Sequence, residues 1–298
     1  MSTDPFSFQE LKAAKIIEAP APKALLMQDG TNLALRSFIP KQPVAILVFY
    51  HGGGAHSAAS YQHIGYELCE TYQVATFMPD IRGHGTSEGT RGDAPSTQRI
   101  LQDIDKTIAF IKETYPDIPL FLGGHSSGAG LALNHSTSIK QDNIDGYIFL
   151  APQLGFRAKT DRQNNPFVQV NILPFIINSI TNGLLCGHNA AVQFNYPAKV
   201  LKKGMLPFYT VNMANALTAS SPYKQLRQLS VPLGVWVGEH DEVLDAKKVE
   251  SFIQQACPHA SIETIAKEKH LSIILAAGNL IGAWIKKQIT PPNNKLAS

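Results

Sequence analysis

The sequence predicts an α/β protein with a mostly parallel sheet, from two observations. Short apolar runs without alternating polar residues are typical of strands that are buried on both faces. These runs alternate with longer stretches of helical periodicity, which give parallel strands the crossover connections that they need. With 298 residues, 44% of them hydrophobic and 16% charged, the chain can also bury a large core.

The first half of the chain supplies four predicted strands and two predicted helices. The strands are expected at residues 44–50, 74–79, 120–123 and 144–150. Apolar side chains at helical spacing predict a helix over residues 98–115. Ser96 or Thr97 is its expected N-cap, and it ends before Pro116. A second helix is expected to begin at Ser126.

The last third of the chain resumes this alternation. Strands are expected at residues 231–237 and 261–265, and helices at 245–256 and 273–289. The final residues, 291–298, are predicted to be a disordered tail.

Residues 152–216 interrupt the alternation, because they are rich in Asn, Pro and apolar residues and show no clear strand–helix–strand unit. We interpret them as a cap inserted into a core of residues 1–151 and 217–290. The length alone favours about two domains at roughly 150 residues each. Without the 65 residues of the insertion, however, 233 remain, a normal size for one α/β unit.

One amphipathic helix is predicted within this insertion. The residues that recur every four positions are Ile172, Ile176, Ile180 and Leu184. Pro174 is compatible with that helix only in the first turn. Because Pro174 and several polar residues interrupt the apolar stretch 167–186, a transmembrane span is not expected.

Charge and cysteine content indicate which classes of binding partner and which cellular compartment to expect. The 26 basic and 23 acidic residues give a net charge of +3 without a strong basic cluster, so no nucleic-acid partner is expected. Cys69, Cys186 and Cys257 are too widely spaced for a disulfide framework. The N-terminus carries early acidic residues and lacks the apolar segment of a secretory signal. We therefore expect a cytoplasmic protein.

A GxSxG motif centred on Ser126 lies directly between a predicted strand and a predicted helix. A sharp strand-to-helix turn projects a serine hydroxyl outward, and glycines at 124 and 128 let neighbouring backbone approach closely. The N-terminus of the following helix also favours developing negative charge. The motif can arise by chance, but its position between strand and helix favours a nucleophile.

A second glycine-rich motif, His51-Gly52-Gly53-Gly54, follows the most apolar predicted strand. Such a turn can leave backbone N–H groups unpaired and directed at a forming oxyanion. It can equally be no more than a flexible turn.

Three ordered motifs resemble the α/β-hydrolase superfamily: HGGGAHS at 51–57, PDIRGHGTSEG at 79–89 and GHSSG at 124–128. The chain is most similar to its monoacylglycerol lipase and lysophospholipase-type serine hydrolases, from about residue 25 to residue 289 and least within the insertion. The resemblance implies an eight-stranded, mostly parallel sheet flanked by helices, with a helical cap (lid) inserted after the sixth strand. It also implies an oxyanion hole formed by the N–H groups of Gly53 and Ser127.

The resemblance further implies a catalytic acid after the strand that follows the insertion, and a histidine after the last strand. Asp241 is the best match for the acid, against Glu239, Glu242 and Asp245 nearby, since Asp245 reads as the N-cap of the next helix. His270 is the only histidine beyond the last predicted strand. The order Ser126, Asp241, His270 is the order expected for this fold.

The remaining histidines and polar loop residues receive no catalytic role. His51, His56, His63 and His84 show no metal-binding spacing, so neither a metal nor an organic cofactor is expected. Asp80, Arg82 and Glu88 are interpreted as residues that brace a turn.

This constellation predicts hydrolysis of carboxylic esters through an acyl-enzyme, with a monoacylglycerol or lysophospholipid as the most plausible substrate class. The same triad serves thioesterases, carbon–carbon bond hydrolases and aminopeptidases, and a non-catalytic ligand-binding protein of the fold is the alternative from a different class. Epoxide hydrolases and haloalkane dehalogenases are disfavoured, because the resemblance implies an aspartate where this chain has Ser126.

The apolar face of the predicted cap helix is the candidate substrate-binding surface. Its residues are Ile172, Ile176, Ile177 and Ile180, with Leu173 and Leu184 beside them. Such a face could line an acyl tunnel, or could only pack the lid onto the core, since both need the same periodicity. A third interpretation is transient contact with a membrane surface.

Overall fold

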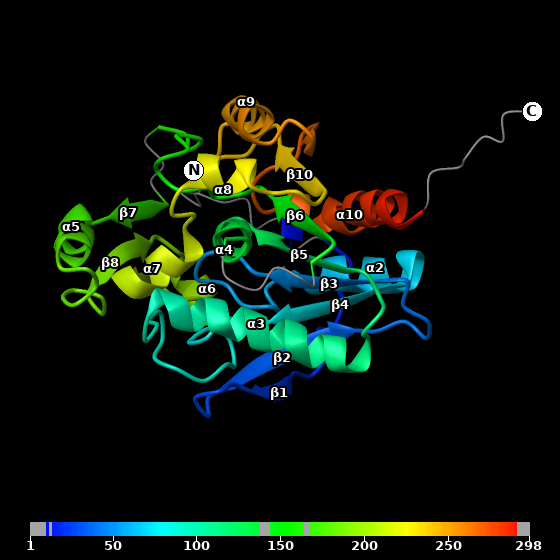
Figure 1. Cartoon of the computed structure of the whole chain (residues 1–298), viewed down its shortest axis with the longest axis horizontal. Coiled ribbons are helices and arrows are strands. Elements are labelled where there is room, and N and C mark those ends of the chain that lie inside the picture. The colour runs from blue at the N-terminus through cyan, green and yellow to red at the C-terminus, as the bar shows by residue number, and fades with distance from the viewer. Residues whose placement is uncertain (1–9, 12–13, 138–143, 164–166, 291–298) are drawn as a thin grey trace, which may run out of the picture.

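A computed structural model of the chain describes residues 10–11, 14–137, 144–163 and 167–290, so the predicted tail at 291–298 lies outside the described residues. The centre of the molecule is an eight-stranded sheet in the order β1-β2-β4-β3-β5-β6-β10-β11 (Figure 1). Its strands are β1 (Lys23–Leu26), β2 (Asn32–Phe38), β3 (Ala45–Tyr50), β4 (Val74–Pro79), β5 (Leu120–His125), β6 (Gly146–Leu150), β10 (Leu233–Gly238) and β11 (Ser261–Ile265). The pairs β1–β2 and β2–β4 are antiparallel and the others are parallel, which confirms the mostly parallel eight-stranded sheet.

Helices pack around this sheet in two groups. In one group, α2 (Gln62–Tyr72) lies against α10 (Ile273–Ile289), where Gly282 gives room for the ring of Tyr72. The other group is a continuous layer of α3 (Thr97–Thr114), α4 (Ser127–His135), α8 (Pro222–Arg227) and α9 (Ala246–Ala256). Ser96 is the N-cap of α3, because its hydroxyl accepts the N–H of Arg99 at 3.1 Å.

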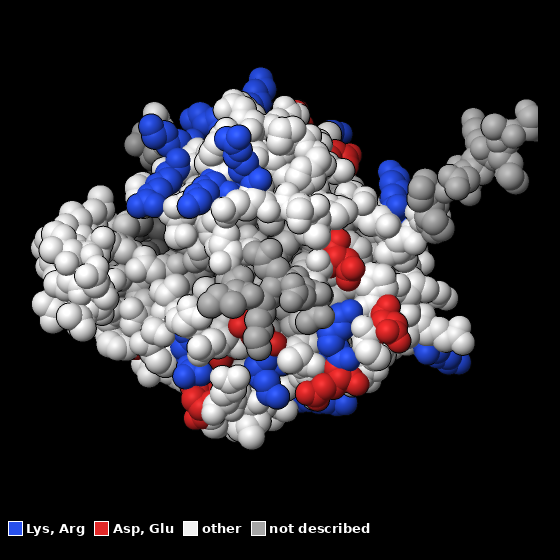
Figure 2. Space-filling view, viewed as in Figure 1, with Lys and Arg blue, Asp and Glu red and all other residues white. Residues whose placement is uncertain are grey.

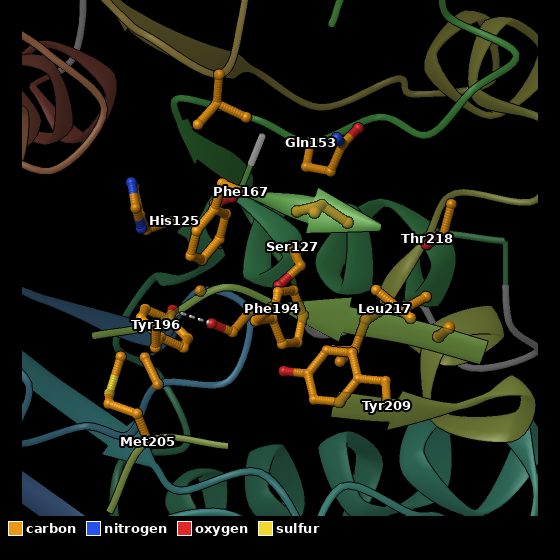
Figure 3. A pocket seen from close by; sticks show the side chains of 18 of the residues that line it. His125, Ser127, Gln153, Phe167, Phe194, Tyr196, Met205, Tyr209, Leu217 and Thr218 are labelled. Atoms are coloured by element: carbon orange, nitrogen blue, oxygen red, sulfur yellow. Dashed lines mark hydrogen bonds between the residues drawn. The ribbon is translucent and has the colours of Figure 1, made fainter. Parts of the chain in front are cut away.

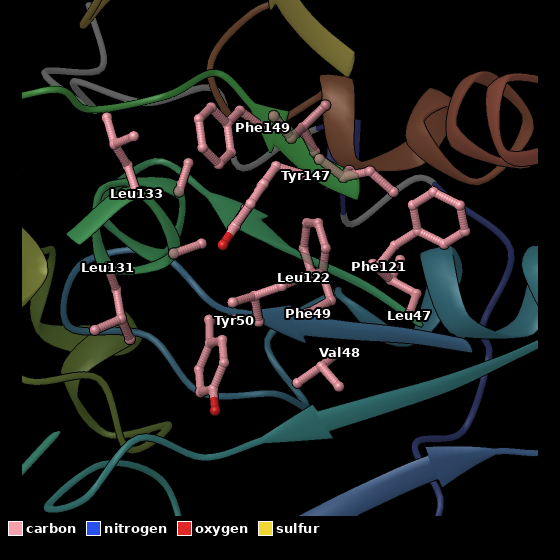
Figure 4. Packing of buried hydrophobic residues seen from close by; sticks show 14 of the residues in the cluster. Leu47, Val48, Phe49, Tyr50, Phe121, Leu122, Leu131, Leu133, Tyr147 and Phe149 are labelled. Atoms are coloured by element: carbon pink, nitrogen blue, oxygen red, sulfur yellow. The ribbon is translucent and has the colours of Figure 1, made fainter. Parts of the chain in front are cut away.

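The central strands form the core. Every residue of β3, β4, β5, β6 and β10 is buried, so both faces of the sheet are covered, as their mainly apolar sequences predict. Figure 4 shows Leu122 and Tyr147 of neighbouring strands directed toward Leu131 of α4, and Phe49 lies on the opposite face of the sheet. This packing gives the carboxyl ends of β3 and β5 a rigid base.

Sequence periodicity located most of the core elements to within a few residues but gave no sign of four others. The predicted strands at 74–79 and 261–265 and the helix at 273–289 have the observed bounds. The strands β1 and β2 and the helices α2 and α8 were not identified individually. β1 is a four-residue edge strand with a single buried residue, so it carries little hydrophobic pattern.

The segment between β6 and α8 contains a second, three-stranded antiparallel sheet in the order β7-β8-β9. Its elements are β7 (Val168–Val170), α5 (Ile172–Ile180), β8 (Ala190–Phe194), α6 (Ala198–Leu201), β9 (Phe208–Thr210) and α7 (Val211–Leu217). The expectation of a purely helical cap is therefore incomplete. Strands of three to five residues are too short to show a clear alternation in sequence. In Figure 1, α5 lies at one end of the molecule, away from the large sheet.

The predicted cap helix is shorter than its periodicity suggested. α5 ends at Ile180, because Asn182 and Gly183 take left-handed backbone angles with φ of 49° and 87°. Leu184 therefore lies beyond the helix. Pro174 is the third residue of α5, in the first turn as expected, and the Asn171 side chain caps the helix by accepting the N–H of Leu173 at 3.3 Å. Among the described helices, none is long and apolar enough to cross a membrane.

Candidate active site

Ser126 stands at the sharp turn between β5 and α4, with φ of 55° and ψ of −118°. A non-glycine residue in this region is strained, which places its side chain outward at the end of the strand. Two glycines permit the turn. A Cβ on Gly128 would lie 2.3 Å from the carbonyl oxygen of Tyr50, and a Cβ on Gly124 would lie 2.5 Å from the carbonyl carbon of Gly128. The glycines of the motif therefore allow the close backbone contacts that the sequence suggested.

Ser126, His270 and Asp241 lie in one hydrogen-bonded line, although they come from three distant parts of the chain. The Nε2 atom of His270 is 3.1 Å from the Ser126 hydroxyl, and its Nδ1 atom is 2.8 Å from Oδ2 of Asp241. Asp241 follows β10, and its Oδ1 accepts the N–H groups of Val243 and Leu244 at 2.8 and 2.7 Å. Because a carboxylate only accepts, Nδ1 of His270 carries the proton and Nε2 is free to accept from Ser126.

Burial and charge set the protonation of this line. Both Asp241 and His270 are buried, with 0% and 4% of their surface exposed. Burial alone would lower the pKa of His270, but the neighbouring carboxylate of Asp241 raises it above the ordinary value of 6.5. Burial would likewise raise the pKa of Asp241, yet the charge and hydrogen bond of His270, with the two N–H groups, hold it below the ordinary value of 3.8. Asp241 is therefore held ionised, and its charge stabilises the imidazolium that forms when His270 takes a proton.

The loop after β3 holds Gly53 with its neighbours fixed by tyrosines. Gly52 donates its N–H to the Tyr61 hydroxyl at 2.8 Å, and Gly54 donates its N–H to the Tyr209 hydroxyl at 2.5 Å. Tyr196 donates its hydroxyl to the carbonyl of Gly53 at 2.6 Å. Within the described part of the chain, no hydrogen bond engages the N–H of Gly53 or of Ser127. Two anchored but unengaged N–H groups thus lie beside Ser126, where a negatively charged oxygen could form.

His125 connects this loop to His270. Its Nε2 lies 2.9 Å from the carbonyl oxygen of His270, so Nε2 carries the proton and Nδ1 accepts the Tyr61 hydroxyl at 2.8 Å. Burial lowers the pKa of His125 to about 3, which keeps this ring neutral at any ordinary pH. One chain of hydrogen bonds therefore runs from the backbone of His270 through His125 and Tyr61 to Gly52.

The polar residues to which the sequence analysis gave no catalytic role form hydrogen bonds and ion pairs that hold loops and a helix end in place. Asp80 accepts the N–H and the hydroxyl of Ser57, and Arg82 forms two 2.8 Å contacts with Asp103. Both interactions brace the loop after β4. Asp245 caps α9 by accepting the N–H of Lys248 at 3.3 Å, as its sequence position suggested.

Glu239 and Glu242, the alternatives to Asp241 as the catalytic acid, bind other groups. Glu239 is about half exposed and accepts the N–H of Lys267, whereas Glu242 accepts the backbone N–H of His270 at 2.9 Å. Neither is bonded to the His270 ring in the interactions that the structure describes. Across the described residues, no group of three or more His, Cys, Asp and Glu side chains could hold a metal ion.

A cavity of about 1420 Å³ opens over Ser126 and is lined mostly by apolar side chains (Figure 3). Phe167, Phe194 and Leu217 line it beside Ser127. Three of the four predicted cap residues, Ile172, Ile176 and Ile180, also line it, although each is half-exposed or more. Ile177 is half-buried and is not among the lining residues, so the structure does not bring it to this cavity.

Sequence reasoning missed the residues that hold the loops in place. Tyr61, Tyr196, Tyr209 and Glu242 lie 9 to 155 positions from the backbone groups that they bind. No motif marks them, because their partners are main-chain atoms that carry no sequence signal. His125 could have been noticed, since it lies inside the GxSxG motif.

Comparison with known proteins gives one family and several relatives. The model of the family described as serine aminopeptidase, S33, matches residues 41–273. Mouse monoglyceride lipase is 24% identical over 230 residues, which are 75% of this chain and 74% of the mouse protein. An abhydrolase domain-containing protein of Dictyostelium discoideum is 34% identical over 163 residues, which are 54% of this chain and only 16% of that relative.

Among solved structures, a soluble variant of monoglyceride lipase from Saccharomyces cerevisiae, in complex with a substrate analogue, superposes with a TM-score of 0.69. It is 17% identical, and the match covers 93% of this chain and 99% of that one. At this identity the likeness shows a shared fold.

Proposed function

Because this chain belongs to the serine aminopeptidase (S33) family and is a carboxylic ester hydrolase, we propose that it cleaves monoacylglycerol- or lysophospholipid-type esters with Ser126 as nucleophile. The observation that carries the proposal is the hydrogen-bonded line Ser126–His270–Asp241, which opens into a large apolar cavity. The line supplies a nucleophile and its base, and the cavity supplies room for an acyl chain.

Acylation begins when Nε2 of His270 takes the Ser126 proton and Oγ of Ser126 adds to the ester carbonyl carbon. Asp241 holds the imidazole in the reactive tautomer and stabilises its positive charge. The carbonyl π electrons move to the oxygen, which accepts hydrogen bonds from the N–H groups of Gly53 and Ser127. His270 then gives its proton to the departing alcohol, and water releases the acid by the same sequence in a second round.

The lining of the cavity supports a substrate with a long acyl chain. Five apolar residues of the cap line the cavity: Phe167, Val168, Phe175, Ile176 and Val192. Burying one methylene contributes about 0.8 kcal/mol, or roughly fourfold in the specificity constant. We expect kcat/KM to rise with chain length until the lining is filled.

A series of p-nitrophenyl esters from acetate to palmitate, together with monooleoylglycerol and a lysophospholipid, tests this function. We expect long-chain esters to be preferred. Ile176→Asp, which adds a charge to the lining, should lower kcat/KM about tenfold for the long esters and leave acetate within about twofold. Leu26→Asp is the control, because Leu26 is exposed on β1 and lines neither the cavity nor the cap. A preference for acetate, or equal losses in both variants, would contradict the acyl-chain assignment.

The outer surface of the cap supports a second part of the proposal, contact with a phospholipid surface. Residues 163–198 contain no Lys, Arg, Asp or Glu. On the face seen in Figure 2, the protruding end that carries α5 shows no charged side chain, while basic side chains gather next to it. Leu173, Leu184 and Leu185 are 62%, 86% and 57% exposed there. An apolar tip beside basic residues is complementary to an anionic bilayer.

Sedimentation with vesicles of phosphatidylcholine and phosphatidylglycerol tests that contact. The double variant Leu173→Asp/Leu184→Asp should lose most vesicle binding and keep its activity on soluble p-nitrophenyl butyrate, because neither side chain lines the cavity over Ser126. Leu26→Asp is the control, since Leu26 is 58% exposed on β1, far from the cap. Unchanged vesicle binding in the double variant would rule out this surface.

A further inference from the structure

The Ser127 hydroxyl is buried and has no hydrogen-bond partner among the described residues. Buried hydroxyls are almost always paired, because an unpaired one loses its bonds to water without replacement. The neighbouring Ser126 hydroxyl, by contrast, is bonded to His270. Thr76, Tyr147 and Thr160 also have buried hydroxyls without a described partner, but of these four residues only Ser127 lines the cavity, where a bound ligand could supply the missing hydrogen bond.

The Ser127 hydroxyl lies next to Gly53, on the loop after β3. A Cβ built on Gly53 would lie 3.5 Å from Oγ of Ser127 and 3.2 Å from the ring of Phe194. Figure 3 shows the Ser127 side chain directed into the cavity beside Phe194. The hydroxyl thus lies between the backbone of Gly53 and that of Ser127, the two residues whose N–H groups are unengaged.

The groups around this hydroxyl already have other partners. The Tyr196 hydroxyl donates to the carbonyl of Gly53, and the Tyr209 hydroxyl binds the N–H of Gly54 and Nε2 of His84. Phe194 offers only an aromatic ring. These neighbours leave the Ser127 hydroxyl without a partner among the described residues, and the cavity that it lines is where a substrate atom could supply one.

We infer that the Ser127 hydroxyl is a third donor to the oxyanion, an inference that rests on the proposed function. As the bond between Ser126 Oγ and the carbonyl carbon forms, the C=O π pair becomes a lone pair on the oxygen, and the Ser126 proton goes to His270. The charged oxygen then accepts two N–H bonds and one O–H bond. This last bond is much stronger to the oxyanion than to the neutral carbonyl, so it lowers the barrier more than it strengthens substrate binding.

The variant Ser127→Ala tests this role, because it removes the hydroxyl and keeps the backbone N–H. We expect kcat on p-nitrophenyl butyrate to fall about tenfold with KM within about twofold. The inhibition constant of a trifluoromethyl ketone, which forms an oxyanion with the enzyme, should rise by a similar factor. Binding of an alkyl ether analogue without a carbonyl should not change. Ser127→Thr, which restores a hydroxyl, should recover most of the lost rate.

Three results would overturn the inference. Unchanged kcat in Ser127→Ala would exclude a third donor. Equal weakening of the ketone and the ether would indicate a structural role. A loss seen with monobutyrylglycerol but not with p-nitrophenyl butyrate would show that the hydroxyl binds the glyceryl group instead. If Ser126→Ala kept full activity, the proposed function itself would fail, so the two failures are distinguishable.

Discussion

Ser126→Ala is expected to lower kcat for ester hydrolysis about 10⁶-fold, because it removes the atom that forms the acyl-enzyme. Fluorophosphonate labelling, which needs an activated serine, should disappear in the same variant. The fold should be retained, since Ser126 takes part in the turn mainly through its backbone. Its N–H donates to the carbonyl of Leu150, and its carbonyl accepts from Ala129 and Gln153.

The matched control for this loss is Ser136→Ala, a serine at the other end of α4 whose hydroxyl bonds only to the carbonyl of Leu133 among the described interactions. It should keep full labelling and nearly full activity. If hydrolysis persisted in Ser126→Ala, Ser126 could not be the nucleophile. Labelling that is absent even in the wild type would favour a non-catalytic binding protein instead.

Asp241→Asn is expected to have the second largest effect, a decrease in kcat of about 10⁴-fold. An asparagine can donate its amide hydrogen to Nδ1 of His270, which places the imidazole proton on Nε2, where it cannot accept from Ser126. The variant should also change the pH dependence, because the carboxylate is what raises the pKa of His270.

The direction of the pH dependence follows from the role of His270 as the general base. His270 must be neutral to take the Ser126 proton, so wild-type kcat/KM should rise with pH as His270 loses its proton, with a midpoint above 6.5. In Asp241→Asn the residual activity should reach its plateau at lower pH, because burial without the carboxylate lowers the pKa of His270.

Glu239→Gln is the control for this pair of measurements, since Glu239 follows the same strand and is exposed. It should leave both the rate and the midpoint nearly unchanged. A wild-type midpoint at or below 6.5, or an Asp241→Asn variant with more than a tenth of the wild-type activity, would contradict the assigned roles.

The central sheet could be predicted because its strands are buried on both faces. β3 is an unbroken apolar run and β4 is apolar except for Thr76, a pattern that can be recognised without knowledge of the neighbouring strands. The edge strand β1 and the short strands β7 and β9 gain their stability from pairing with segments far along the chain. Pairing partners leave no local periodicity, so these strands and the small cap sheet escaped prediction.

The candidate triad could be chosen from the sequence because Ser126 lies in the GxSxG motif and the resemblance to α/β-hydrolases implies an acid and a histidine after later strands. In the structure Ser126 follows β5, Asp241 follows β10 and His270 lies beyond the edge strand β11. Carboxyl ends of parallel strands meet at one edge of a sheet, so strand order already brings these residues near one another. The cap isoleucines show the limit of this reasoning. Ile176 and Ile177 have the same character in sequence, and only the packing of α5 separates the lining residue from its neighbour.

The sequence by itself determined the fold class and the strand-to-helix turn at Ser126, because local hydrophobic pattern and glycine placement encode them. The chain order of the candidate triad was expected from the resemblance to α/β-hydrolases. Only the tertiary structure decided that the N–H groups of Gly53 and Ser127 stay without a described hydrogen bond. The loop that carries Gly53 is fixed by Tyr61, Tyr196 and Tyr209. It also decided that the Ser127 hydroxyl is buried without a partner. Both properties depend on hydrogen bonds between residues far apart in the chain, whose geometry exists only after the core has packed.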